Sequence, residues 1–201
     1  LEEDDLFILQ PTRIVSRKGI EHSIELVSRL NNGKARLVIS HSAGDEGFEY
    51  EKRVRGFAEL MGVNLIIRPD IIGEERSTTE DGRKIYTLWD IYPYADFVTY
   101  PSIYEGFGNA FLEAIYFRKP IMVNRYSIYE TDIEPRGFNV ISMNGYVTDE
   151  VVRKVEDLLA NPDEITEMVE KNFAIAKKFF SFESLINKLK NILLFFEGIS
   201  S

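Results

Sequence analysis

Cysteine is absent from the 201 residues of the sequence, so the chain can form neither disulfide bonds nor thiolate metal sites. Histidine is scarce as well, with only two residues. Two histidines alone give little support to a zinc site, which usually draws three or four ligands from His, Cys and acidic side chains. We therefore expect no zinc site. A chain without cysteine is most simply placed in the cytoplasm.

Long apolar runs and a surplus of basic residues are also missing. No apolar run reaches the ~18 residues that cross a bilayer, so we expect no transmembrane segment. With 24 Lys and Arg against 33 Asp and Glu, the formal net charge is -9. That balance argues against nucleic-acid binding, which needs a basic face. The chain begins with Leu rather than Met and lacks the order of a signal peptide, so we interpret it as part of a longer protein.

Short apolar runs alternate with segments of helical spacing along the chain. The runs predict strands at residues 6–9, 37–39, 63–67, 97–100, 121–123 and 140–141. The spacing predicts helices at residues 20–30, 48–61, 85–94, 109–117, 148–159, 163–179 and 182–197. This alternation indicates an α/β fold with a doubly wound, Rossmann-like parallel sheet of about six strands, helices on both faces and further helices at the C-terminus. We interpret residues 1–201 as a single domain.

Smaller features add detail to this interpretation. The polar residues 71–84, which include two glycines, predict a surface loop or hairpin. Gly62 is placed to end the second helix, and Thr148 to cap the start of a later one. The last predicted helix, residues 182–197, is too apolar for a free surface helix. We therefore expect part of it to pack on the sheet.

A basic segment follows the first predicted strand. Residues 11–19 read Pro-Thr-Arg-Ile-Val-Ser-Arg-Lys-Gly and place Arg13, Arg17 and Lys18 within six positions. Sheets of this kind bind ligands at the carboxyl ends of their strands. Arginine offers a planar fork to phosphate oxygens, and lysine offers a mobile charge. Composition alone also allows the alternative that this is only a solvated basic loop.

A second segment, residues 101–113, follows the fourth predicted strand and enters a helix. Gly106 and Gly108 permit the close approach of a ligand to the backbone. The helix N-terminus offers free N–H groups and the positive end of a dipole, which suit a diphosphate. Glu105 and Glu113 place a carboxylate on each side. The alternative is that the glycines only shape a turn and the carboxylates lie on the surface.

Together the two segments resemble glycosyltransferase family 4, a large retaining family whose members are relatives of bacterial glycogen synthase and sucrose-phosphate synthase. That family carries two Glu separated by seven residues, in a context like E-G-F-G-x-x-x-L-E-A, and residues 105–114 match it without a gap. It also carries an upstream Arg, four residues and Lys-Gly, which Arg13, Lys18 and Gly19 match. Residues 94–102 look like the stretch that precedes the double-Glu motif, and the resemblance covers about residues 6–160.

The resemblance implies the C-terminal, donor-binding half of a two-domain GT-B enzyme that binds a nucleotide-diphosphate sugar. Arg13 and Lys18 would hold the diphosphate and stabilise its departure, and Glu105 would contact hydroxyls of the transferred sugar. Glu113 would contact the ribose. Backbone N–H groups would come from Gly106, Phe107, Gly108 and Asn109.

The same resemblance implies how a complete enzyme would work. The family keeps the anomeric configuration, uses no metal ion and needs an N-terminal domain for the acceptor, so we expect this chain by itself to be inactive. The C-terminal helix of the family often crosses to that domain. We therefore expect Phe195 and Phe196 to be exposed here.

The sequence departs from the family pattern after the double-Glu helix. Arg118 stands before Lys-Pro where the family usually has Gly, and residues 124–129 read Asn-Arg-Tyr-Ser-Ile-Tyr where it has a Gly pair. We expect these bulky residues to border the donor sugar. Arg125 is either an added cation for a phosphorylated group or a packing variation.

Several alternatives stay open from the sequence. UDP is our first expectation for the nucleotide and GDP the second, and ADP also fits. A module that binds a nucleotide or sugar phosphate without transferring it is the alternative function. His41 ends the second predicted strand on the ligand side, where it either touches a ligand or has no functional part.

Overall fold

The computed structural model describes residues 2, 4–30, 32–41 and 48–199, with the side chains of residues 195–199 left out of the description. Its centre is a parallel sheet of six strands in the order β3-β2-β1-β7-β8-β9. These strands are β1 (Leu6–Gln10), β2 (Ala35–Ile39), β3 (Asn64–Ile67), β7 (Phe97–Tyr100), β8 (Ile121–Asn124) and β9 (Ile141–Met143). The predicted doubly wound fold is confirmed, including a strand near residues 140–141.

The strand order fixes where a ligand site can form. The chain moves outward from β1 through β2 to β3, then returns to pair β7 with the other side of β1. At such a reversal the loops after the two central strands diverge and leave a crevice at their carboxyl ends. Here these are the loops that follow Gln10 and Tyr100, which are the two segments that the sequence singles out.

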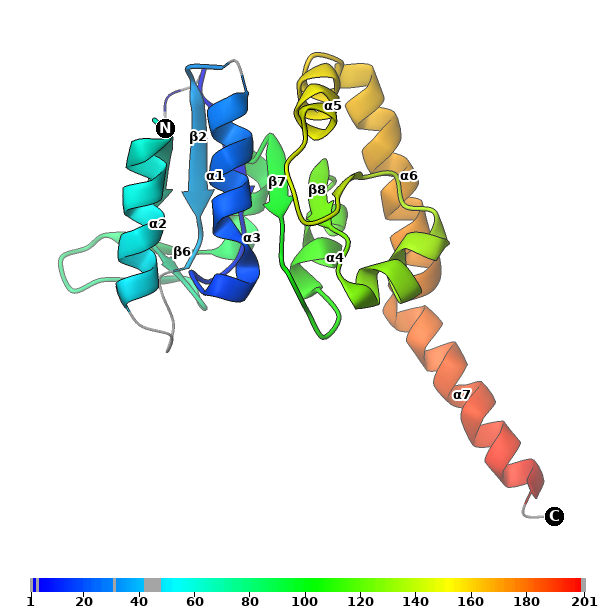
Figure 1. Ribbon diagram of the computed structural model, residues 1–201. Helices are drawn as coiled ribbons and strands as arrows, with labels where there is room; N and C mark the ends of the chain where they lie inside the picture. Colours follow the sequence, from blue (N-terminus) through cyan, green and yellow to red (C-terminus); the bar gives the residue numbers. More distant parts are fainter. Residues whose placement is uncertain (1, 3, 31, 42–47, 200–201) are drawn as a thin grey trace.

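Helices cover both faces of the sheet (Figure 1). Side chains alternate across a strand, so Ile8 packs in one core cluster while Phe7 and Leu9 pack in the other. The first cluster takes residues of α1 (Ile20–Arg29), α2 (Phe48–Leu60) and α5 (Asp149–Leu159). The second takes residues of α4 (Asn109–Tyr116), and α6 (Pro162–Phe180) lies beside α4 and α5.

The two helix ends predicted at Gly62 and Thr148 are also confirmed. Gly62 follows α2 with φ at 68°, the left-handed conformation typical of a glycine after a helix. The Thr148 hydroxyl accepts a hydrogen bond of 3.3 Å from the Val151 N–H at the start of α5.

Residues 71–94 fold differently from the prediction. A small sheet forms from β4 (Ile72–Gly73), β5 (Ser77–Thr78) and β6 (Lys84–Thr87), with β5 and β6 antiparallel, as in the predicted hairpin. The helix predicted from residue 85 starts only at α3 (Leu88–Ile91). Thr87 and Asp90 form a capping box there, which fixes the start of the helix. The preceding residues pair with β4 instead, and Tyr92–Tyr94 form a 3-10 turn.

The last helix was expected to pack partly on the sheet, and this prediction is wrong. α7 (Phe182–Ile199) runs away from the body of the molecule (Figure 1). Leu185, Leu189 and Ile192 are each 50 or 51% exposed. The side chains of Phe195 and Phe196 lie outside the described residues. In the part of the chain that the structure describes, no helix is long and apolar enough to cross a membrane.

Candidate functional site

The two segments singled out by the sequence are joined through their backbones. After β1 the chain makes a 3-10 turn, η1 (Ser16–Lys18), and Gly19 leads into α1. The Ile103 N–H donates a hydrogen bond of 2.8 Å to the Arg17 carbonyl. Gly19 has φ at 62°, and a Cβ on it would collide with the Pro101 carbonyl oxygen. Only glycine satisfies both the conformation and the close approach.

A cavity of about 650 Å³ opens where these segments meet. Seven of the eight predicted site residues line it: Arg13, Lys18, Glu105, Phe107, Gly108, Asn109 and Glu113. Gly106 lies in the same loop but is not among the lining residues. Residues 92 positions apart in the sequence, such as Arg13 and Glu105, thus share one cavity because β1 and β7 are neighbours.

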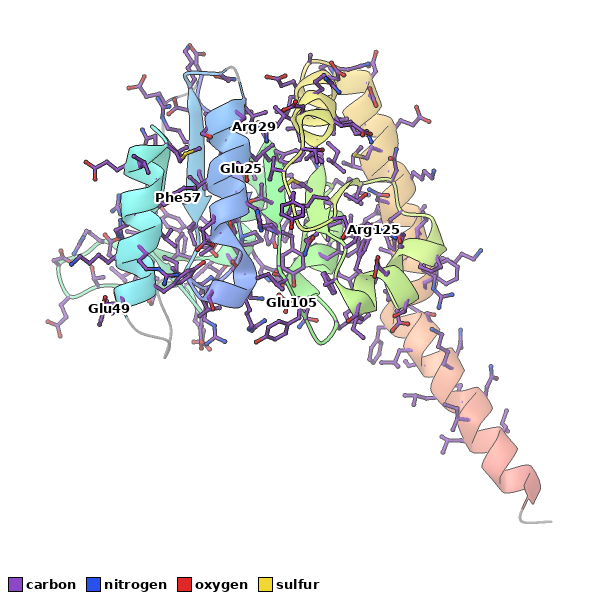
Figure 2. The ribbon with its side chains drawn as sticks, in the orientation of Figure 1. Glu25, Arg29, Glu49, Phe57, Glu105 and Arg125 are labelled. Carbon is purple, nitrogen blue, oxygen red and sulfur yellow. The ribbon has the colours of Figure 1, made fainter. Side chains whose placement is uncertain are left out.

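Glu105 is held by two cations in this cavity. Its Oε2 accepts from Nη1 of Arg17 at 3.1 Å, and its Oε1 accepts from Nζ of Lys18. Burial is the largest single influence and raises the pKa of the Glu105 carboxyl, but the hydrogen bond and charge of Lys18, together with hydrogen bonds from Ser102 and Tyr100, outweigh it, so the pKa falls below its usual value. Glu105 is therefore ionised at neutral pH (Figure 2 shows its place in the loop after β7).

Lys18 and Arg13, which both line the cavity, have different surroundings. Burial lowers the pKa of Lys18, and Glu105 partly offsets that effect. Arg13 is exposed, and within the described part of the chain no carboxylate lies within ion-pair distance of it. Its guanidinium is therefore available to an anionic ligand, whereas Lys18 would have to exchange Glu105 for one.

The far wall of the cavity is the start of α4. Gly108 precedes the helix with φ at 105°, and no side chain caps the helix N-terminus. The first N–H groups of a helix have no partner within it, and they carry a partial positive charge. One turn further on, Glu113 accepts a hydrogen bond of 3.1 Å from the Tyr92 hydroxyl. The cavity thus brings together cations, the N–H groups at the start of α4 and the carboxylates of Glu105 and Glu113.

Comparison with known proteins identifies the chain. Residues 82–174 match the model of the family described as glycosyl transferases group 1. The chain carries a group 1 glycosyltransferase domain. Mannosylglucosylglycerate synthase of Thermotoga maritima is 36% identical to it over 217 residues, which cover 92% of this chain and 48% of that protein. The Petrotoga mobilis protein of the same name is 36% identical over 160 residues, covering 71% of this chain and 36% of that protein. The chain therefore spans about half, or less, of these relatives.

Solved structures share the fold of the group 1 domain at low sequence identity. The C-terminal domain of the group 1 family protein LpcC from Francisella tularensis matches with a TM-score of 0.68 and 15% identity, covering 89% of this chain and 88% of that one. HepE of Anabaena, solved in complex with UDP, matches with a TM-score of 0.75 and 14% identity, covering 94% of this chain and 49% of that one. These likenesses establish the architecture of the domain.

Several further residues of the group 1 domain line the cavity, although the sequence analysis did not select them as site residues. Arg17, Tyr100, Glu74 and Leu88 line it, as does His41. Burial lowers the pKa of His41, and the charge of Arg13 lowers it further, so the imidazole is neutral at pH 7. Arg17 was visible only as one of three clustered cations. Glu74 lies between β4 and β5, inside the predicted loop or hairpin, and Leu88 is the first residue of α3, which was predicted to start at residue 85.

Residues 124–129 were expected to border the donor sugar, but they do not line the cavity. Arg125 instead makes two hydrogen bonds to Glu134, at 2.8 and 2.9 Å, and an ion pair with Glu130 at 3.2 Å. The Arg125 charge is thus balanced within its own segment; Arg125 is labelled in Figure 2. Among the described residues, no group of three or more His, Asp or Glu side chains is placed to hold a metal ion.

Proposed function

We propose that this chain binds a nucleotide-diphosphate sugar and, together with an N-terminal acceptor domain, transfers the glycosyl group with retention of configuration. The observation that supports it most is the convergence of Arg13, Lys18 and the start of α4 on one cavity. Three sources of positive charge in one place fit a diphosphate better than a neutral ligand.

Each residue has a role in this proposal. Arg13 and Lys18 bind the diphosphate and stabilise the charge that grows on it as the glycosidic bond breaks, without a metal ion. Backbone N–H groups of residues 106–109 add to this stabilisation. Glu105 accepts hydrogen bonds from hydroxyls of the transferred sugar, and Glu113 does the same for the ribose. The 650 Å³ of the cavity is of the size that holds a small-molecule ligand.

The relatives suggest a particular reaction. Two of them are named mannosylglucosylglycerate synthase, so mannosyl transfer to glucosylglycerate is the first reaction to test. The nucleotide is proposed as UDP or GDP.

The exposed side of α7 supports the proposed second domain. Leu185, Leu189 and Ile192 would lose their water contact if a further domain packed on them. A relative of about twice the matched length leaves room for such a domain.

The test uses a longer protein that includes this chain and the proposed N-terminal domain. It is given GDP-mannose or UDP-glucose with glucosylglycerate, and the anomeric configuration of the product is read by NMR. We expect transfer from an α-linked donor to give an α-linked product, and Glu105→Gln to lower kcat about 100-fold or more. Nucleotide binding without any transfer would favour the binding-module alternative, and a β-linked product would contradict retention.

A further inference from the structure

The end of β8 and the segment that follows it hold the loop of residues 101–108 through side chains that do not line the cavity. The Asn124 amide donates a hydrogen bond of 3.0 Å to the Ser102 carbonyl near the start of this loop. The Tyr126 hydroxyl donates one of 2.9 Å to the Phe107 carbonyl near its end. Both side chains are buried, and neither lines the cavity. The sequence marked this segment as a departure from its family, and the proposed function gives it no role.

The hydrogen bond from Tyr126 fixes one peptide plane. In a trans peptide the C=O and N–H bonds point in opposite directions, and the described chain contains no cis peptide bond. Because the Phe107 carbonyl points at the buried Tyr126, the Gly108 N–H must point the other way. Phe107, Gly108 and Asn109 line the cavity whereas Tyr126 does not, which indicates that this N–H points toward the cavity. No acceptor for the Gly108 N–H is found in the described part of the chain.

Without this hydrogen bond the plane would be free to turn. Glycine tolerates both signs of φ, so rotation of the Phe107–Gly108 peptide meets little steric resistance at Gly108. A turned peptide would present a carbonyl oxygen, with its negative end, to a bound anion. The Tyr126 hydroxyl oxygen itself lies against Gly108, since a Cβ there would collide with it. Burial also raises the pKa of Tyr126, so its hydroxyl keeps the proton that it donates.

We infer that Tyr126 is a positioning residue, which locks the Phe107–Gly108 peptide so that the Gly108 N–H faces the diphosphate of the donor. This inference rests on the proposed function, because it assigns the diphosphate to this cavity. It differs from the roles of the cavity residues, since Tyr126 acts only through the backbone that it holds.

The test compares Tyr126→Phe with Tyr129→Phe in the 201-residue chain. Tyr129 is a matched control because it lies in the same segment and has the same 2% exposure, while its hydroxyl makes no hydrogen bond to the described loop 101–109. The probes are UDP and GDP, each beside its nucleoside, and affinities are measured by NMR titration. The amide signal of Gly108 reports directly on the peptide.

We expect Tyr126→Phe to weaken binding of the diphosphate roughly tenfold, the size of one hydrogen bond to a charged group, and to leave nucleoside binding unchanged. The shift of the Gly108 amide signal on diphosphate binding should shrink in this variant and persist in Tyr129→Phe. Equal diphosphate affinity in wild type and Tyr126→Phe would overturn the inference alone. So would an equal loss for diphosphate and nucleoside, which indicates general damage. Absence of binding by the wild type would contradict the proposed function as well.

Discussion

Lys18 donates a hydrogen bond to a carboxylate oxygen of Glu105 across 87 positions of sequence. This contact joins the two segments that the sequence singles out. It also gives Lys18 two roles that exclude each other, because Lys18 can neutralise Glu105 or bind a phosphate. A lysine that neutralises a protein carboxylate is less available to a phosphate, so diphosphate and Glu105 compete for the same cation.

This competition predicts opposite effects of two substitutions on nucleotide binding. Glu105→Gln keeps the shape of the side chain but removes the competing charge, so we expect UDP or GDP to bind this chain a few-fold more tightly. Lys18→Ala removes the cation, and we expect affinity to fall about tenfold or more. Isothermal titration calorimetry measures both.

The control for these variants is Glu25→Gln. Glu25 pairs with Arg29 on α1, away from the cavity (both are labelled in Figure 2). It should leave affinity unchanged. If Glu105→Gln weakened nucleotide binding, then Glu105 would be supporting the diphosphate and not competing with it.

The approach of Gly19 to Pro101 predicts a large loss of stability for Gly19→Ala. The substitution adds a Cβ at φ 62° that collides with a backbone oxygen, and we expect it to lower the free energy of unfolding by about 2–4 kcal/mol. Gly56→Ala is the opposite control, because Gly56 lies exposed within α2 and an added Cβ there meets nothing within 4 Å. It should raise stability by about 0.5–1 kcal/mol. Urea unfolding monitored by circular dichroism compares the two, and similar values would contradict the close packing of the segments.

The sequence predicted the central sheet because its strands are short, apolar and rich in β-branched residues, as in Leu37, Val38 and Ile39. It located the site because a parallel sheet brings the carboxyl ends of its strands to one edge. Both predictions depend on short stretches of sequence, and each stretch fits only one arrangement in a parallel sheet.

Other features depend on tertiary pairing that no local pattern records. Ile85 and Tyr86 fit a helix or a strand equally well, and pairing with β4 makes them a strand. The role of Tyr126 follows from the neighbouring positions of β7 and β8, which bring its hydroxyl to Phe107. The apolar pattern of α7 indicated burial, but most of its described apolar side chains are exposed.

Because α7 is exposed, we expect substitutions on it to affect the stability of this chain much less than substitutions in the core. Leu189→Asn should change the melting temperature by about 1 °C or less, because a half-exposed side chain has little packing to lose. Leu26→Ala, fully buried on α1, should lower the free energy of unfolding by about 2–5 kcal/mol. In a longer protein with the proposed acceptor domain, Leu189→Asn should become destabilising. Differential scanning calorimetry of both proteins checks this, and no effect in the longer protein would contradict the packing of a second domain on α7.

Nucleotide binding at the cavity is the central claim, and a thermal-shift panel of UDP, GDP and ADP tests it most directly. It would use this chain, Glu113→Ala and, as a control, Glu59→Ala on the exposed side of α2. A ligand at a hundred times its dissociation constant stabilises by ~2.7 kcal/mol, a rise of roughly 5–10 °C for a chain of this size. We predict such a rise with UDP or GDP, preserved in Glu59→Ala and largely lost in Glu113→Ala, whose carboxylate is proposed to hold the ribose. A rise that is the same in all three proteins, or no rise with any nucleotide, would contradict the account.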